Sequence, residues 1–169
     1  MTVDERKLQE LIDRNEIVET IYRYASSIDQ KDYATLRSVF TDDVVAQYAG
    51  APEIHGADKL TSWIDEMGVE RAFQHHLINV YEVKIDGDEA RALVYHTSHQ
   101  TNAADPDTVY VIVGRYRDVL RRVDGRWLIA DKRMEVGWME DRRVSQADMA
   151  AREAEENLAA QARAGEDVG

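Results

Sequence analysis

Two adjacent histidines, His75 and His76, stand in the segment AFQHHLINVYEVKID, whose composition and alternation are typical of a β-strand. Successive side chains of a strand point to opposite faces, so only one of the two rings can face the interior. An imidazole oriented by a carboxylate can take a proton from a substrate, because the acid also stabilises the charged ring. The candidate chemistry is therefore proton abstraction by one of these two histidines.

The alternation along this strand favours His75 as the inward residue. We predict that His75 faces the interior beside Phe73 and Leu77, and that His76 faces outward in an apolar patch suited to contact another subunit. A buried histidine can also serve only as a hydrogen-bonded core residue. The prediction rests on the more apolar odd-numbered set, which consists of Phe73, His75, Leu77, Asn79, Tyr81, Val83 and Ile85.

The following strand, EARALVYHTSHQ, contains two further histidines. Its small, uncharged even-numbered residues predict an inward face that includes His96, which leaves His99 at the periphery. A metal site formed by all these histidines is a weaker alternative, because neighbouring histidines on a strand diverge. We expect no metal and no other cofactor.

Asp29 is the acid that we expect beside His75. It stands where the helical pattern of the N-terminal segment ends, and the helix dipole disfavours a carboxylate there unless a donor or a cation compensates it. If Asp29 faces the interior, it orients the imidazole of His75 for acid–base catalysis. The alternative is a solvated turn residue.

Further polar groups could complete such a site. Tyr24 precedes Asp29 on the same helix and Tyr48 ends the next strand, so either phenol could polarise a carbonyl or protonate a leaving hydroxyl. Each could equally be an ordinary core residue. Lys132 or Arg133 on the last strand could stabilise an oxyanion, and the alternation does not decide between them.

The composition restricts the possible partners. The chain has 169 residues, enough for one domain, and a formal net charge of −12, which argues against nucleic acid and anionic lipid as partners. It contains no cysteine, so thiolate chemistry is excluded. With no apolar signal segment at the N-terminus and no run long enough to span a membrane, we expect a cytoplasmic protein that binds a small molecule.

The elements that must position these residues follow an α+β order. Helical patterns come first, and long antiparallel strands joined by glycine-containing turns follow. We expect a cone-shaped α+β barrel, with the N-terminal helices packed in the concave face of a curved, mostly antiparallel sheet and a mouth that admits a ligand. We divide the chain into a domain over residues 1–144 and a helical or frayed tail over 145–169.

Five segments of the chain resemble the SnoaL-like branch of the nuclear transport factor 2-like superfamily. The resemblance covers residues 5–138 and is carried by SSIDQKDYATLRSVFTDDV, IHGADKL, HHLIN, IDGDEARA and VDGRWLI. In dehydratase-like members of this fold, an Asp at the end of the long helix and a His on the sheet form the acid–base dyad. The resemblance assigns these positions to Asp29 and His75, and places Tyr24, Tyr48 and His96 in the pocket with Phe73, Leu77 and Lys132.

The resemblance implies a cofactor-independent lyase, a dehydratase or related eliminating enzyme acting on a hydrophobic cyclic or aromatic-derived molecule. An isomerase or a polyketide-type cyclase would use the same dyad. A non-catalytic subunit, like the small chain of a ring-hydroxylating dioxygenase, is the alternative from another class. Members of this fold also lead us to expect a homo-oligomer, either a dimer or a trimer.

Overall fold

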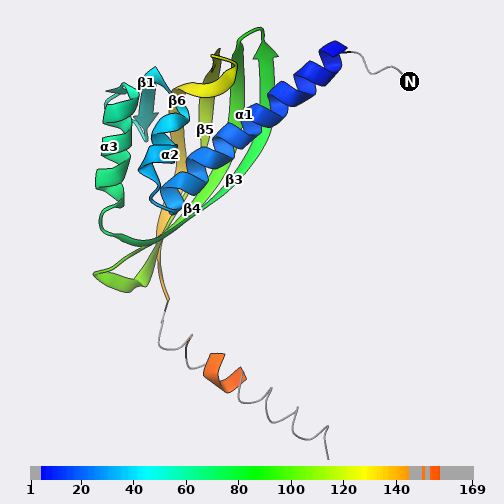
Figure 1. The fold of residues 1–169 in the computed structure, drawn as a ribbon. Coiled ribbons are helices and arrows are strands. Elements are labelled where there is room, and N and C mark those ends of the chain that lie inside the picture. The colour runs from blue at the N-terminus through cyan, green and yellow to red at the C-terminus, as the bar shows by residue number, and fades with distance from the viewer. Residues whose placement is uncertain (1–4, 145–149, 151–152, 157–169) are drawn as a thin grey trace, which may run out of the picture.

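The computed structural model describes residues 5–144, 150 and 153–156 (Figure 1). Most of the predicted tail, residues 145–169, therefore lies outside the described residues. The elements are α1 (Glu5–Asp29), α2 (Tyr33–Ser38), β1 (Phe40–Tyr48), β2 (Ile54–His55), α3 (Ala57–Gly68), β3 (Arg71–Asp86), β4 (Glu89–Asn102), β5 (Asp105–Val123) and β6 (Arg126–Arg143).

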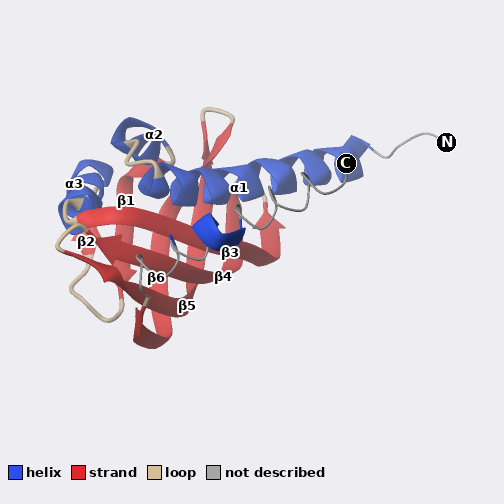
Figure 2. Ribbon diagram, turned by 90° about the horizontal axis from the view of Figure 1, so that it is seen from below, coloured by secondary structure: helices blue, strands red, loops and turns tan. Residues whose placement is uncertain are grey.

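The strands form a single curved sheet in the order β2-β1-β6-β5-β4-β3. Neighbouring strands run antiparallel, except that β1 and β6 are parallel. Helix α1 lies across the concave face of the sheet, and α2 and α3 lie near its β1 end (Figures 1 and 2). The structure thus confirms the predicted α+β cone. None of the helices in the described part of the chain has the length and apolar character needed to cross a membrane.

Helix α1 is continuous from Glu5 to Asp29 and buries one stripe of side chains. The buried residues recur at intervals of three and four, so they lie on the side of the helix that faces the sheet. The apolar residues of the first turns, Leu8, Leu11 and Ile12, are exposed instead. The N-terminal end of the helix projects past the sheet, so no core covers these three residues (Figure 1).

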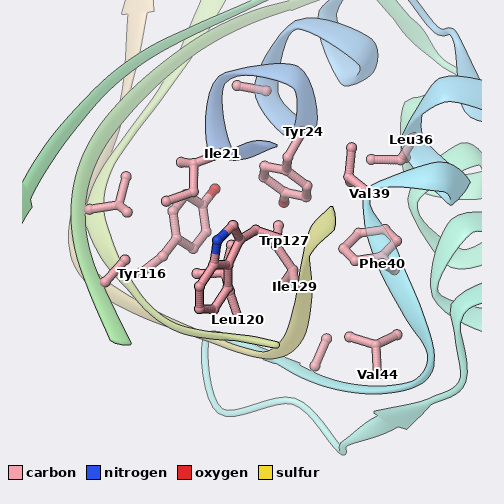
Figure 3. Close-up of a cluster of buried hydrophobic side chains, with 14 of the residues drawn as sticks. Ile21, Tyr24, Leu36, Val39, Phe40, Val44, Tyr116, Leu120, Trp127 and Ile129 are labelled. Atoms are coloured by element: carbon pink, nitrogen blue, oxygen red, sulfur yellow. The ribbon is translucent and has the colours of Figure 1, made fainter. Parts of the chain in front are cut away.

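The core fills the space between α1 and the sheet (Figure 3). Tyr24 from α1 meets Tyr116 from β5 there, with ring centroids 6.0 Å apart and the planes near perpendicular. Edge-to-face contact of this kind is favourable for aromatic rings. This aromatic layer lies at the boundary between the core and the candidate site.

A β-bulge in β3 reverses which side chains face the core. Val80 pairs with Val94, but the next partners are Glu82 and Leu93, so β3 contains one extra residue at this point. The inward positions are therefore even-numbered before the bulge and odd-numbered after it, where Val83 is buried. The prediction of one alternation along the whole strand was wrong.

A buried ion pair fastens α1 to the β5–β6 hairpin. The Arg122 guanidinium donates to both carboxylate oxygens of Asp13 at 2.8 and 2.6 Å, and these bonds lower the pKa of Asp13 to about 2. The side chains of Gln9 and Trp127 also donate to this carboxylate. Asp13 thus anchors the middle of α1 to the opposite end of the chain.

We expect Asp13→Ala to lower the free energy of unfolding by about 2–3 kcal/mol, because Arg122 then loses its buried partner. Asp88 also accepts a bond from Arg122, but its side chain is 80% exposed. Asp88→Ala is therefore the matched control and should change stability by less than about 1 kcal/mol. Urea denaturation measures both variants, and equal effects would contradict this assignment.

Candidate active site

The carboxylate of Asp29 binds His76, the second histidine of the pair. One oxygen accepts a bond from the backbone N–H of His76 at 2.9 Å, and the other lies 2.6 Å from its ring Nδ1. Asp29 is the last residue of α1, where helix carbonyls disfavour a negative charge. Its two bonds to β3 supply the compensating donors.

This geometry selects one protonation form of the His76 ring. Because Asp29 is an acceptor, Nδ1 carries the proton and donates it, which leaves the lone pair of Nε2 free. The ring lines the largest apolar cavity of the described residues, and its side chain is 8% exposed. His76 can therefore accept a proton from a molecule bound in that cavity, and Asp29 stabilises the resulting charge.

The predicted inward set of β3 lies on the outer face of the sheet. His75 is exposed, and Phe73 and Leu77 are 61% and 51% exposed, so none of the three lines the cavity. The ring of His75 stacks near that of His99, with centroids 6.0 Å apart. The placement of His75 beside Asp29 was wrong, because the bulge after Val80 turns the even-numbered side chains inward.

His96 faces the cavity, as its strand pattern predicted, and is 3% exposed. Its ring lies almost parallel to that of His76, with centroids 6.4 Å apart, and 4.5 Å from that of Tyr116. Gly114 makes this position possible, because a Cβ there would lie 3.1 Å from the His96 ring and 2.4 Å from the carbonyl oxygen of Glu135.

Burial lowers the pKa of His96 to about 4, and the nearby His76 lowers it further. The neutral ring is thus present near pH 7, where it can accept or donate one hydrogen bond but carries no charge. Its Nδ1 is buried and has no hydrogen-bond partner among the described residues. His96 therefore contributes a neutral polar group to an otherwise apolar wall.

This shift makes stability depend on pH. As the pH falls from 6.5 towards 4, the unfolded chain binds a proton at His96 that the folded chain does not. Wild-type protein should lose about 3 kcal/mol of unfolding free energy over this range that His96→Gln does not lose. Urea denaturation of both proteins at several pH values measures the difference, and identical pH profiles would contradict it.

The phenols of Tyr24 and Tyr48 meet on the cavity wall, where their oxygens are 3.0 Å apart. Burial raises the pKa of both groups, so both remain protonated. The Tyr48 ring also packs on Trp63 of α3, with centroids 4.9 Å apart. The structure therefore places both predicted tyrosines in the cavity as hydrogen-bonding groups.

Lys132 lies beneath the cavity wall rather than on it. Its side chain is completely buried, and its ammonium group binds both oxygens of Asp118 at 3.1 and 3.0 Å. Arg133, the alternative considered from the sequence, binds Glu53 and Asp131 on the other face of the strand. Neither cation lines the cavity, so the expected direct contact of Lys132 with an oxyanion was wrong.

The cavity measures about 300 Å³ and combines an apolar wall with a polar one. Such a volume suits a small organic molecule. Met67 and Met139, which line the cavity, are more than half exposed. The apolar lining consists of Ile28, Trp63, Ile64, Met67, Ile112, Met134, Val136 and Met139, and the polar side chains are those of Tyr24, Tyr48, Arg71, Gln74, His76, His96, Ser98, Gln100 and Tyr116.

Sequence reasoning missed the inward position of His76 and the buried acid Asp118. The bulge that turns His76 inward leaves no clear pattern in the sequence. Asp118 does leave one, since it shares a strand face with Tyr116 and Leu120, where an acid is unusual. Within the described ranges, no group of three or more histidine or acidic side chains could hold a metal ion.

Together, this fold and site define a class of small α+β cones with a ligand cavity between helices and sheet. The sequence profile of the SnoaL-like domain matches residues 9–133, and the chain belongs to this family, part of the nuclear transport factor 2-like superfamily. A related protein of Mycobacterium tuberculosis, Rv2910c, is 29% identical over 121 residues, which cover 71% of this chain and 82% of the relative. Rv2910c is described as uncharacterised.

Solved structures share the fold at low sequence identity. A protein of Novosphingobium aromaticivorans described as a putative scytalone dehydratase superposes with a TM-score of 0.72 and 18% identity, covering 80% of this chain and 91% of its own. The hexachlorocyclohexane dehydrochlorinase LinA-type3 of Novosphingobium barchaimii gives 0.73 and 14%, covering 80% and 94%. At these identities the comparison establishes the fold alone, which occurs in proteins named for elimination reactions.

Proposed function

We propose that the protein is a cofactor-independent lyase, a dehydratase or related eliminating enzyme, that uses Asp29 and His76 as its acid–base dyad. The observation that carries this proposal is the double contact of Asp29 with His76, which fixes the ring beside an apolar cavity. The dyad predicted from the sequence is kept in its chemistry, with His76 in place of His75.

The proposed reaction begins when Nε2 of His76 takes a proton from a substrate carbon. The electron pair of the broken C–H bond forms the new double bond as the leaving group departs from the neighbouring carbon. If that group is hydroxide, it takes the proton back from His76 and leaves as water. Asp29 stabilises the charged ring between the two steps, and a phenol of Tyr24 or Tyr48 hydrogen-bonds the substrate oxygen.

The cavity favours a hydrophobic cyclic or aromatic-derived substrate. Trp63 and Ile112 present apolar surface to a flat ring, while the polar side chains are available to bind a few oxygens. The structural neighbours are named for scytalone and hexachlorocyclohexane, two cyclic compounds. Isomerisation or ring closure by the same dyad is the alternative, because only the fate of the carbanion differs.

A substrate screen in deuterated water tests the proposal and separates these reactions. Scytalone, hexachlorocyclohexane and simple cyclic β-hydroxyketones serve as the probes, and mass spectrometry follows the loss of water or chloride. Elimination supports a lyase, whereas deuterium incorporation or rearrangement without group loss supports an isomerase. Failure of every probe to react or exchange would favour a non-catalytic binding subunit.

We also propose that the outer face of the sheet binds a second copy of this chain. Leu77, Thr97, Val113 and Trp138 form one row across four strands on this face. Several large side chains here are more than 40% exposed, which is typical of an interface. Arg115 and Arg117 pair with Glu135, and Arg142 pairs with Glu140, so the charges of this face largely balance one another. Two copies of a chain of net charge −12 can therefore meet here with little repulsion.

We expect Leu77→Arg to weaken this association at least about tenfold, because it buries an unpaired charge in a homo-oligomer contact. Analytical ultracentrifugation over a range of protein concentrations measures the change. Leu8→Arg is the control, since Leu8 is an exposed apolar residue of α1 away from the sheet. A wild-type protein that remains monomeric at all concentrations would refute the proposal.

A further inference from the structure

The ion pair of Lys132 and Asp118 occupies the centre of the fold beneath the candidate site. Both side chains are completely buried, and the two residues stand directly opposite each other on β6 and β5. Buried ion pairs seldom stabilise a protein more than well-packed apolar residues of the same size would. The energetics of folding therefore do not explain why charges stand here.

The ammonium group of Lys132 reaches past Asp118 to the aromatic layer. Its Nζ lies 4.0 Å from the centroid of the Tyr24 ring and 3.8 Å from that of Tyr116. These two rings stand almost perpendicular to each other, one from α1 and one from β5 (Figure 3). A cation against both ring faces holds the rings in place and draws electron density from their phenols.

The phenols in contact with this cation have a hydrogen to donate. Tyr24 and Tyr48 are linked by one hydrogen bond, which uses one of their two hydroxyl hydrogens. The other hydrogen has no acceptor in a hydrogen bond found among the described residues, and both side chains line the cavity. A ligand oxygen that accepts this hydrogen would complete the set.

We propose that the Lys132–Asp118 pair is a positioning device that holds the tyrosine hydroxyls to bind a substrate carbonyl oxygen on which negative charge develops. The inference rests on the proposed function and narrows its substrate to a carbonyl compound with a leaving group on the β carbon. Asp118 balances the buried charge of Lys132, so the ammonium stays in place when no ligand is bound. Lys132 acts through the rings of Tyr24 and Tyr116 and does not touch the substrate.

The carbonyl gives the elimination a defined intermediate. When His76 takes the proton from the carbon beside the carbonyl, the electron pair moves into a carbon–carbon double bond and the carbonyl π electrons move to oxygen. The phenol hydrogen bond stabilises this enolate oxygen. The enolate then re-forms the carbonyl, the bond from the β carbon to its hydroxyl breaks, and the hydroxide leaves as water with the proton from His76.

Binding of 4-nitrophenol tests the inference without turnover, because its ionised form resembles an enolate and absorbs visible light. Nitrobenzene, which has no ionisable oxygen, is the neutral control ligand. Wild-type protein should bind the phenolate at least about tenfold more tightly than nitrobenzene, as expected for a charge-assisted hydrogen bond. Lys132→Met/Asp118→Leu should lose this preference and keep its affinity for nitrobenzene, and Tyr48→Phe should reduce it.

Matched variants separate positioning from packing. Arg133→Met/Asp131→Leu removes an ion pair from the outer side of the same strand and should keep the preference. If the apolar double variant does not fold, Lys132→Gln/Asp118→Asn removes the charges with little change in shape and should show the same loss. A preference that persists without the Lys132–Asp118 charges, or an equal loss of nitrobenzene affinity, would overturn the inference, as would wild-type protein that does not prefer the phenolate.

The same measurement in His76→Gln separates this inference from the proposed function. If the phenolate preference survives in that variant, the phenols and not the imidazole produce it. A protein that prefers the phenolate but eliminates nothing would leave the carbonyl site standing and refute the lyase. If the preference disappears in His76→Gln, the charge comes from the dyad and the role of Lys132 is overturned.

Discussion

Replacement of His76 by glutamine is expected to reduce turnover about 10²- to 10⁴-fold, the range typical of a lost general base. Glutamine retains hydrogen-bonding capacity and comparable bulk but has no basic nitrogen to accept the proton. The effect should appear in kcat, measured on the substrate found in the screen, with little change in the melting temperature.

His75→Gln is the matched control, since the two residues are neighbours in the sequence on opposite faces of β3. This variant should retain wild-type turnover, because His75 lies on the outer face away from the cavity. A large loss in His75→Gln together with normal activity in His76→Gln would refute the assignment and restore the prediction made from the sequence.

Asp29→Asn extends the same test to the second member of the dyad. An amide oxygen can still accept one bond from His76, but it stabilises the charged imidazole less than a carboxylate does. We therefore expect turnover to fall in this variant too, with the loss concentrated in kcat. Equal losses in Asp29→Asn and in the double variant with His76→Gln would show that the two residues act as a unit.

Replacement of Lys132 alone by methionine is expected to lower the free energy of unfolding by about 3–5 kcal/mol. The loss arises because Asp118 then remains buried without a cation, in a place where burial already raises the pKa of its carboxyl. Lys132→Met/Asp118→Leu should recover most of this stability, since it leaves no buried charge. Urea denaturation at pH 7 measures both variants.

Lys84→Met provides the surface comparison for Lys132→Met. Lys84 pairs with Glu82, but its side chain is 74% exposed, so water already solvates both charges. Its loss should change stability by no more than about 0.5 kcal/mol. A double variant at positions 118 and 132 that remains as unstable as Lys132→Met would mean that the pair itself, and not the unpaired acid, determines stability.

The sequence alone determined the architecture and most of the polar groups of the site. Periodic apolar residues identified the long helix and its end at Asp29, and the glycine turns identified the β3–β4 hairpin. The alternation along β4 assigned His96 correctly to the inner face. These features depend on local patterns, which the chain carries in the order of its residues.

Only the tertiary structure decided which neighbouring histidine meets Asp29. Near the hairpin turn, Val83 faces inward as the uniform alternation predicts, but the bulge after Val80 shifts every earlier residue to the opposite face. A single extra residue in one strand has no reliable signature in sequence, yet it exchanges the positions of His75 and His76. Lys132 shows the same limit, because its burial under the aromatic layer depends on Asp118 in the adjacent strand.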